Sequence, residues 1–142
     1  MSSPTEHPLS GADFIRQFFP NSPYVAHLGI QLNDIQPGVA TLSLPFASEL
    51  VTIGTIVHGG AIASLIDTAA MVAAWSDTEV PAKARGTTVN LTVAYLASVE
   101  KEDLQAVARV LRRGRNLVYL DVEVRSASGN AVAKGLVTYK LG

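Results

Sequence analysis

A long apolar segment in the middle of the chain limits the folds that are open to it. The segment VHGGAIASLIDTAAMVAAWS (57–76) contains one charged side chain, that of Asp67, and no lysine or glutamate. Its most apolar part, residues 61–75, is shorter than the about 20 residues of a membrane-spanning helix, where an acid in mid-span would also be costly. The segment therefore predicts a helix that other parts of a folded domain cover on nearly every side.

The flanking segments predict the elements that cover this helix. Residues 12–20 place aromatic and aliphatic side chains at helical spacing and predict a short packing helix that Pro20 ends. Residues 40–44 alternate between apolar and polar side chains and predict a strand after a turn at residues 36–38. Residues 46–57 show no clear period and predict a loop, and residues 76–86 predict a connector. Four further strands, arranged as a meander, are predicted at residues 87–96, 104–111, 117–125 and 131–141.

These elements predict an α+β fold in which a curved antiparallel β-sheet wraps one long central helix. The unpaired edges of such a sheet favour edge-to-edge dimerisation, in which the sheets of two subunits join. The length of 142 residues predicts a single domain over residues 1–142, in which residues 1–11 are flexible.

Composition excludes several classes of function. Eleven basic and 12 acidic residues give a net charge of −1, which argues against nucleic acid as a partner. The chain has no cysteine, so disulfides, thiolate metal sites and a cysteine nucleophile are excluded. No cluster of histidines or carboxylates has ligand spacing, so we expect no metal and no cofactor. The first residues do not form a signal peptide, so a cytoplasmic protein without a membrane partner is expected.

Asp67 and the two glycines at the helix start are the candidates for chemistry. A carboxylate among apolar side chains is either satisfied by neighbours such as Ser64 or Thr68, or it acts as a general base or nucleophile. Gly59 and Gly60 expose backbone N–H groups at the positive end of the helix dipole, where a carbonyl oxygen could bind. The alternative is that the two glycines form only a tight turn.

The pattern His58-Gly59-Gly60 followed by Leu65 and Asp67 carries a family resemblance. Together with VNLTVAYL (89–96) and the segment from residue 110 to the end, it resembles the hotdog-fold acyl-CoA thioesterases of the phenylacetate-pathway (PaaI-like) type over residues 25–142. The resemblance implies hydrolysis of acyl-CoA to the free acid and coenzyme A, with coenzyme A present only as part of the substrate. It also implies a homodimer, or a dimer of dimers (a homotetramer), with active sites at the dimer interface.

Helix geometry leads to the same shared site. Gly60 and Asp67 are seven residues apart, which corresponds to about 10 Å of rise along a helix. A base and an oxyanion donor that act on one carbonyl must both lie within a few ångströms of it. We therefore expect Asp67 of one subunit to face Gly59 of the other subunit.

The resemblance also implies an assisting hydroxyl, which falls on Thr88 or, with a shift of one residue, on Thr87. Relatives tend to carry an asparagine before the His-Gly-Gly motif, but residues 49–57 contain none, and Thr52 is the substitute candidate. His58 is expected to be a structural residue bonded to a backbone carbonyl. A hydratase or dehydratase that uses His58 with Asp67 is the alternative enzyme, and a non-catalytic acyl-CoA binding module is the alternative of another class.

The remaining candidates concern substrate binding. The basic turn with Arg112, Arg113 and Arg115 either binds the phosphates of coenzyme A or is a solvated turn. Lys83 and Arg85 could serve the same purpose. An apolar acyl pocket is expected between the helix start and residues 46–56, with one of three phenylalanines as a wall. The candidates for substrate contact are His58, Gly60, Thr52, Arg112, Arg113 and Arg115, and those for the wall are Phe14, Phe18 and Phe19.

Overall fold

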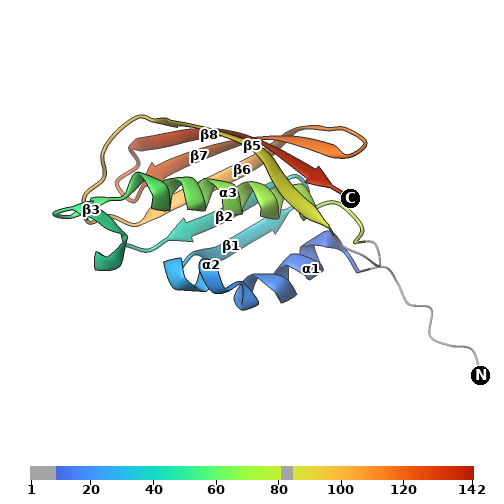
Figure 1. Cartoon of the computed structure of the whole chain (residues 1–142), viewed down its shortest axis with the longest axis horizontal. Coiled ribbons are helices and arrows are strands. Elements are labelled where there is room, and N and C mark those ends of the chain that lie inside the picture. Colours follow the sequence, from blue (N-terminus) through green and yellow to red (C-terminus); the bar gives the residue numbers. More distant parts are fainter. Residues whose placement is uncertain (1–8, 81–84) are drawn as a thin grey trace, which may run out of the picture.

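A central helix, α3 (Gly59–Trp75), lies across the concave face of a curved six-stranded sheet (Figure 1). The structure is a computed structural model that describes residues 9–80 and 85–142. Eleven of the 17 residues of α3 are buried, so the prediction of a covered apolar helix is confirmed. The α+β architecture that was predicted, a long helix wrapped by an antiparallel sheet, is the architecture observed.

The order of strands in the sheet differs from the predicted meander. The order is β1-β2-β6-β7-β8-β5, and all neighbours are antiparallel. β5 pairs with β8, and β6 pairs with β2, because residues 96–103 form a long connection rather than a hairpin turn. The strands are β1 (Gln31–Gln36), β2 (Val39–Leu44), β5 (Gly86–Tyr95), β6 (Leu104–Arg113), β7 (Leu117–Ser126) and β8 (Ala131–Leu141).

Alternating side chains of the sheet form the core against α3. Leu120, Val122 and Val124 of β7 are at most 1% exposed, as their alternation with charged residues predicts. Each such side chain contributes about 1.5–3 kcal/mol through burial. At Gly135 of β8 a Cβ atom would come within 2.5 Å of Ile66 Cγ2, so a glycine lets β8 lie close to α3.

The N-terminal region contains more helix than the sequence predicted. α1 (Gly11–Phe18) continues through Pro20 as a 3-10 turn, η1 (Phe19–Asn21), and α2 (Pro23–Leu28) follows. α2 was missed because its proline occupies the first helical turn, where proline needs no N–H partner. The Gly11 N–H donates to Thr78 O at 2.7 Å, which fixes the start of α1 beside the end of α3.

The predicted loop at residues 46–57 contains local structure. It forms the 3-10 turn η2 (Ser48–Leu50) and a small hairpin of β3 (Val51–Ile53) and β4 (Ile56–Val57). The Val57 N–H donates to Val99 O at 2.9 Å, so the hairpin is tied to the connection that follows β5.

The sheet leaves one stripe of α3 uncovered. The members of this stripe recur at intervals of three or four residues, so they lie on one face of the helix, and each is exposed or half-buried. They are Gly60, Ala63, Ser64, Asp67 and Met71. The one charged residue of α3 therefore lies on its accessible face.

Candidate active site

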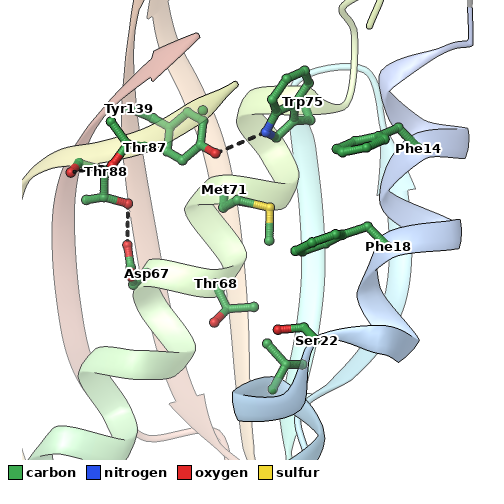
Figure 2. A pocket seen from close by; sticks show the side chains of 12 residues that line it. Phe14, Phe18, Ser22, Asp67, Thr68, Met71, Trp75, Thr87, Thr88 and Tyr139 are labelled. Carbon is green, nitrogen blue, oxygen red and sulfur yellow. Dashed lines mark hydrogen bonds between the residues drawn. The ribbon is translucent and has the colours of Figure 1, made fainter. Parts of the chain in front are cut away.

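Asp67 is held by a hydroxyl from the sheet. Thr88 Oγ1 of β5 donates a hydrogen bond of 2.6 Å to Asp67 Oδ1 (Figure 2). Thr87 Oγ1 instead faces Thr88 O at 3.5 Å, so Thr88 is the threonine that contacts the acid. Asp67 lies on the uncovered stripe of α3 and is half-buried.

The two neighbours that could have satisfied Asp67 bond to the backbone of α3 instead. Thr68 Oγ1 donates to Ser64 O at 2.7 Å, and Ser64 Oγ donates to Gly60 O at 2.9 Å. Within the described residues, the hydrogen-bond partner of Asp67 is therefore Thr88, and the second carboxylate oxygen has no protein donor.

A cavity of about 390 Å³ opens beside Asp67 (Figure 2). Its walls combine aromatic and aliphatic side chains with polar ones and come from α1, α2, α3, β5 and β8. Phe14 and Phe18 line it, whereas Phe19 is buried in the core. The lining residues are Phe14, Phe18, Ser22, Val25, Asp67, Thr68, Met71, Trp75, Gly86, Thr87, Thr88 and Tyr139.

One end of this cavity is closed by a hydrogen-bonded aromatic pair. Trp75 Nε1 donates to the Tyr139 hydroxyl at 3.0 Å, and the Trp75 ring packs against Phe14. Burial raises the pKa of Tyr139, and the nearby charge of Asp67 raises it further. Tyr139 therefore stays a neutral phenol. The sequence offered no signal that would have brought Trp75 and Tyr139 together.

The start of α3 is an N-cap that uses a histidine. The first N–H groups of a helix have no partner within it, and a side-chain acceptor usually satisfies one of them. His58 Nδ1 accepts from the Gly60 N–H at 2.7 Å, while the N–H groups of Ala61 and Ile62 donate to His58 O. The prediction that His58 bonds to a backbone carbonyl was wrong, since its partner is an N–H group.

This cap leaves one donor unused. Among the described residues, no acceptor lies within hydrogen-bond reach of the Gly59 N–H, and the Gly60 N–H is already occupied by His58. Because His58 Nδ1 is an acceptor, its proton lies on Nε2 and the imidazole has no free lone pair. His58 therefore does not have the geometry of a general base.

At each of the two glycines of the turn, a neighbouring side chain leaves little room for a Cβ atom. A Cβ atom at Gly60 would lie 2.8 Å from His58 Nδ1, so the cap requires glycine at this position. A Cβ atom at Gly59 would lie 3.3 Å from the Tyr95 ring, whose hydroxyl donates to Gly59 O at 2.8 Å. The sequence placed Tyr95 only within a predicted strand at residues 87–96.

A second groove, of about 430 Å³, lies beside Gly59. Thr52, Tyr95 and Ser98 contribute polar groups to a lining that is otherwise mainly apolar. The groove includes part of the region in which the acyl pocket was predicted, but Asp67 and the phenylalanines lie at the other cavity. Gly59 and Asp67 are eight residues apart on one continuous helix, which is about 12 Å of rise.

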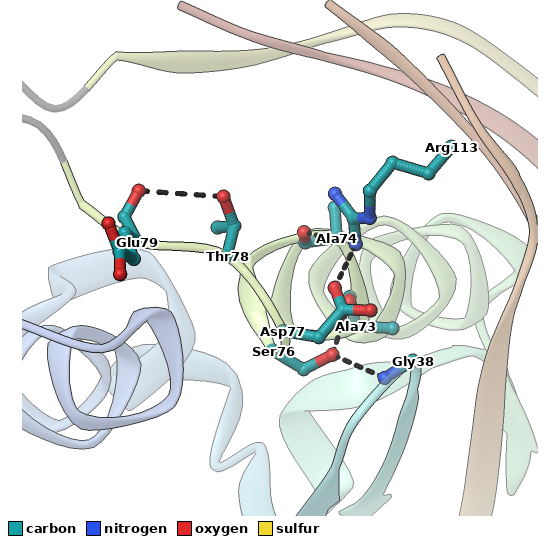
Figure 3. A network of polar contacts seen from close by, with 8 residues as sticks. All are labelled: Gly38, Ala73, Ala74, Ser76, Asp77, Thr78, Glu79 and Arg113. Atoms are coloured by element: carbon teal, nitrogen blue, oxygen red, sulfur yellow. Dashed lines mark hydrogen bonds and ion pairs between the residues drawn. The ribbon is translucent and has the colours of Figure 1, made fainter. Parts of the chain in front are cut away.

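The three arginines of the predicted basic turn have different surroundings. Arg113 turns toward the end of α3, where it donates to Ala74 O at 3.0 Å and pairs with Asp77 (Figure 3). This guanidinium satisfies an unpaired helix carbonyl and is not free for a phosphate, which corrects the prediction for Arg113. Arg112 and Arg115 are exposed and line a groove at the β6–β7 turn.

Backbone contacts bring Arg85 close to the same turn. The Gly142 N–H donates to Arg85 O at 2.9 Å, and the Leu141 N–H donates to Asn116 O at 2.8 Å. Arg85 and the β6–β7 turn therefore meet at the end of β8. Lys83 and His7 lie outside the described residues, and His27 is an exposed residue in the last turn of α2.

No group of three or more histidines and carboxylates in residues 9–80 and 85–142 could hold a metal ion. Over the same residues, no helix has the length and apolarity needed to cross a membrane.

Known proteins resemble this arrangement in sequence and in fold. The profile of the thioesterase superfamily matches residues 54–133, which is more than half of the chain. The chain belongs to the thioesterase superfamily. A protein of Halobacterium salinarum that is named as a predicted esterase is 31% identical over 126 residues, which cover 87% of this chain and 83% of the relative.

Solved structures of this superfamily have the same hotdog fold. A thioesterase family protein from Silicibacter pomeroyi is 27% identical, with a TM-score of 0.85 over 93% of this chain and 98% of the other. The Escherichia coli PaaI protein, from the phenylacetic acid degradation operon, is 20% identical with a TM-score of 0.81 over 93% and 94% of the two chains. The predicted resemblance to hotdog thioesterases is confirmed at the level of the superfamily.

The histidine cap generates a prediction about stability. We expect His58→Ala to lower the free energy of unfolding by about 1 kcal/mol, because the Gly60 N–H loses its acceptor. His58→Asn should restore most of this loss, since asparagine is a strong N-cap residue. Urea denaturation of both variants measures the difference. An alanine variant as stable as the wild type, or an asparagine variant no better than alanine, would contradict the cap.

Proposed function

We propose that this thioesterase-superfamily protein hydrolyses acyl-CoA thioesters to a free acid and coenzyme A. The observation that carries the proposal is the pair formed by a carboxylate and an unused amide. Asp67 lies in a cavity with one oxygen held by Thr88, and the capped helix start leaves only the Gly59 N–H without an acceptor. A general base and a preorganised donor are the two groups that hydrolysis of a thioester needs.

The chemical step uses water as the nucleophile. Asp67 accepts a proton from a water molecule while the water oxygen attacks the carbonyl carbon, and the Gly59 N–H stabilises the negative charge on the carbonyl oxygen. When the tetrahedral intermediate collapses, the C–S bond breaks and the sulfur leaves as a thiolate that takes up the proton. Direct attack by the carboxylate would form an anhydride that water then opens, and single-turnover labelling with solvent oxygen distinguishes the two routes.

The two groups act together only if two subunits share the site. The helix rise of about 12 Å keeps Gly59 away from the carbonyl that Asp67 of the same chain can reach. The free edge of the sheet at β5 offers a way to join two copies. This edge is long and carries the exposed apolar side chains of Val89, Leu91 and Tyr95, which favours pairing with another strand.

The opposite edge strand is much less suited to pairing. β1 is shorter and has the polar side chains of Asn33 and Asp34 at an irregularity in its register, and Pro37 follows it. Such features protect an edge from association. We therefore assign the dimer contact to β5.

The positions of two residues on β5 fix the register of this dimer. Thr88 contacts Asp67 at one end of the strand, and Tyr95 contacts Gly59 near the other end. An antiparallel pair of β5 strands with its two-fold axis midway between these positions, at residues 91–92, brings Thr88 of one subunit beside Tyr95 of the partner subunit. Asp67 then faces Gly59 of the partner subunit.

The same register divides the substrate between the two cavities. We assign the acyl group to the cavity beside Asp67, whose walls include Phe14, Phe18 and Met71. The pantetheine arm, with its two amides, fits the groove of the partner subunit that carries Thr52 and Ser98. A two-fold axis at residues 91–92 places Arg85 beside that groove, with Arg112 and Arg115 as further candidates for binding the phosphates.

Two finer assignments, the acyl group and the assembly, are also proposals. We propose an aromatic acyl group, because the chain resembles the PaaI-like type and aromatic side chains line the acyl cavity. A dimer of dimers is the proposed assembly, with exposed Tyr119 and Leu136 on the outer face of the sheet as its contact. A hydratase that uses His58 as its base is disfavoured, because His58 Nδ1 already accepts from the Gly60 N–H.

The proposed function predicts that the protein hydrolyses acyl-CoA and that this activity depends on Asp67. With acetyl-, hexanoyl-, benzoyl- and phenylacetyl-CoA, the wild type should release free thiol from at least one substrate. Asp67→Asn should lower kcat by about 100-fold or more, because the amide cannot accept the proton. His58→Asn, which keeps the cap, should retain most of the activity. The non-catalytic binding module would bind these substrates without releasing thiol, and a hydratase would lose activity with His58→Asn as severely as with Asp67→Asn.

The register of the dimer gives a prediction of its own. The chain has no cysteine, so a single introduced cysteine reports one distance between subunits. Leu91→Cys or Thr92→Cys should oxidise to a disulfide-linked dimer, because both residues lie next to the two-fold axis and the Cα atom of each is within the about 7 Å limit of its own copy. Non-reducing electrophoresis after mild oxidation measures the product.

Val89→Cys is the matched control for this experiment. Val89 is on the same strand and is more exposed than Leu91, at 51% against 36%. In the proposed register its two copies are separated by about 13 Å or more, so the same oxidation should form no disulfide and the variant should run as a single chain on the non-reducing gel. Efficient cross-linking at residue 89 with none at residues 91 and 92 would disprove the register.

A further inference from the structure

We infer that Tyr95 is a positioning residue, whose hydroxyl holds the peptide next to the Gly59 N–H in the orientation that the reaction needs. This inference rests on the proposed function. Tyr95 lies on β5, and its hydroxyl donates to Gly59 O of α3 at 2.8 Å, so this hydrogen bond joins the sheet to the helix. Its ring also lies close to the glycine, since a Cβ atom at Gly59 would be 3.3 Å from it.

Two hydrogen bonds hold the Gly59–Gly60 peptide at its two ends. Its carbonyl accepts from the Tyr95 hydroxyl, and its N–H donates to His58 Nδ1 at 2.7 Å. The preceding peptide, which carries the Gly59 N–H, is held at its carbonyl, because His58 O accepts from two helix N–H groups. The peptide planes on both sides of Gly59 are therefore held in place. As a result, the direction of the Gly59 N–H is fixed as well.

This restraint matters because the residue is a glycine. Glycine has the greatest backbone freedom, and its ordering costs the most conformational entropy. A donor that is already oriented before the reaction stabilises the developing oxyanion more than one that must first be ordered. Removing the Tyr95 hydroxyl should therefore lower kcat and leave substrate affinity nearly unchanged.

Tyr24 offers a matched control. Its side chain is 58% exposed, close to the 54% of Tyr95. Its hydroxyl also forms a hydrogen bond with a residue of α3. The partner is Ser64 Oγ at 2.9 Å, one turn after the glycines. Tyr24→Phe thus removes a comparable hydroxyl and a comparable hydrogen bond without touching the peptides that flank the Gly59 N–H.

The experiment compares Tyr95→Phe with Tyr24→Phe in the full-length protein. The phenylalanine keeps the ring on β5, and size-exclusion chromatography checks that the assembly is unchanged. With the most active of the four acyl-CoA substrates named above, Tyr95→Phe should lower kcat about tenfold, the effect of one lost hydrogen bond of about 1.4 kcal/mol, with KM changed by less than about twofold. Tyr24→Phe should change both constants by less than about twofold.

A second readout needs no substrate. Amide hydrogen exchange of residues 58–60 should be about tenfold faster in Tyr95→Phe and unchanged in Tyr24→Phe, because only the first variant loosens the turn. Unchanged exchange with Tyr95→Phe would overturn the inference, and so would a raised KM with an unchanged kcat, which would make Tyr95 a substrate-binding wall. Faster exchange in a protein that hydrolyses no acyl-CoA would support the role of Tyr95 in holding the turn and disprove the proposed function.

Discussion

The structure depends on the need to cover one apolar helix. α3 has apolar residues around most of its circumference, so a sheet must curve around it, and small residues such as Gly135 let the strands come close. A single sheet cannot enclose a helix completely. The face that stays open carries Asp67, and the strand at the nearby edge of the sheet supplies Thr88 to hold it. The covering of the helix and the placement of the acid are therefore consequences of the same packing problem.

The parts of the fold that depend on side-chain period were predictable from the sequence. The helix at residues 59–75 and the strands of the C-terminal half were predicted within a few residues, because Leu120, Val122 and Val124 alternate with charged residues and the helix lacks a polar face. Asp67 was identified as the candidate acid because no other charge interrupts its segment. Thr88 was placed only through the family resemblance, and its contact with Asp67 agrees with that placement.

The parts that depend on long-range pairing or on local bond direction were not predictable in this way. The sequence shows that β5 is a strand, but its pairing with β8 rather than β6 depends on the path of residues 96–103. In the sequence, the three arginines of the β6–β7 turn cannot be told apart. In the structure, Arg113 points inward because it donates to a free carbonyl at the end of α3. His58 was expected to bond to a carbonyl, whereas the orphan N–H groups at a helix start make it an acceptor.

The shared site is the central claim, and subunit mixing tests it most directly. Gly59→Pro removes the N–H at the first helical position, where proline is favoured, and His58 already has the extended backbone that precedes proline. Gly59→Ala, which adds a Cβ but keeps the N–H, is its control and should remain active. Equal amounts of Asp67→Asn and Gly59→Pro subunits, each inactive alone, should recover about a quarter of wild-type activity, because half of the dimers are hybrids with one intact site. No recovery, with hybrid dimers demonstrated by differential tagging, would contradict a site built from two chains.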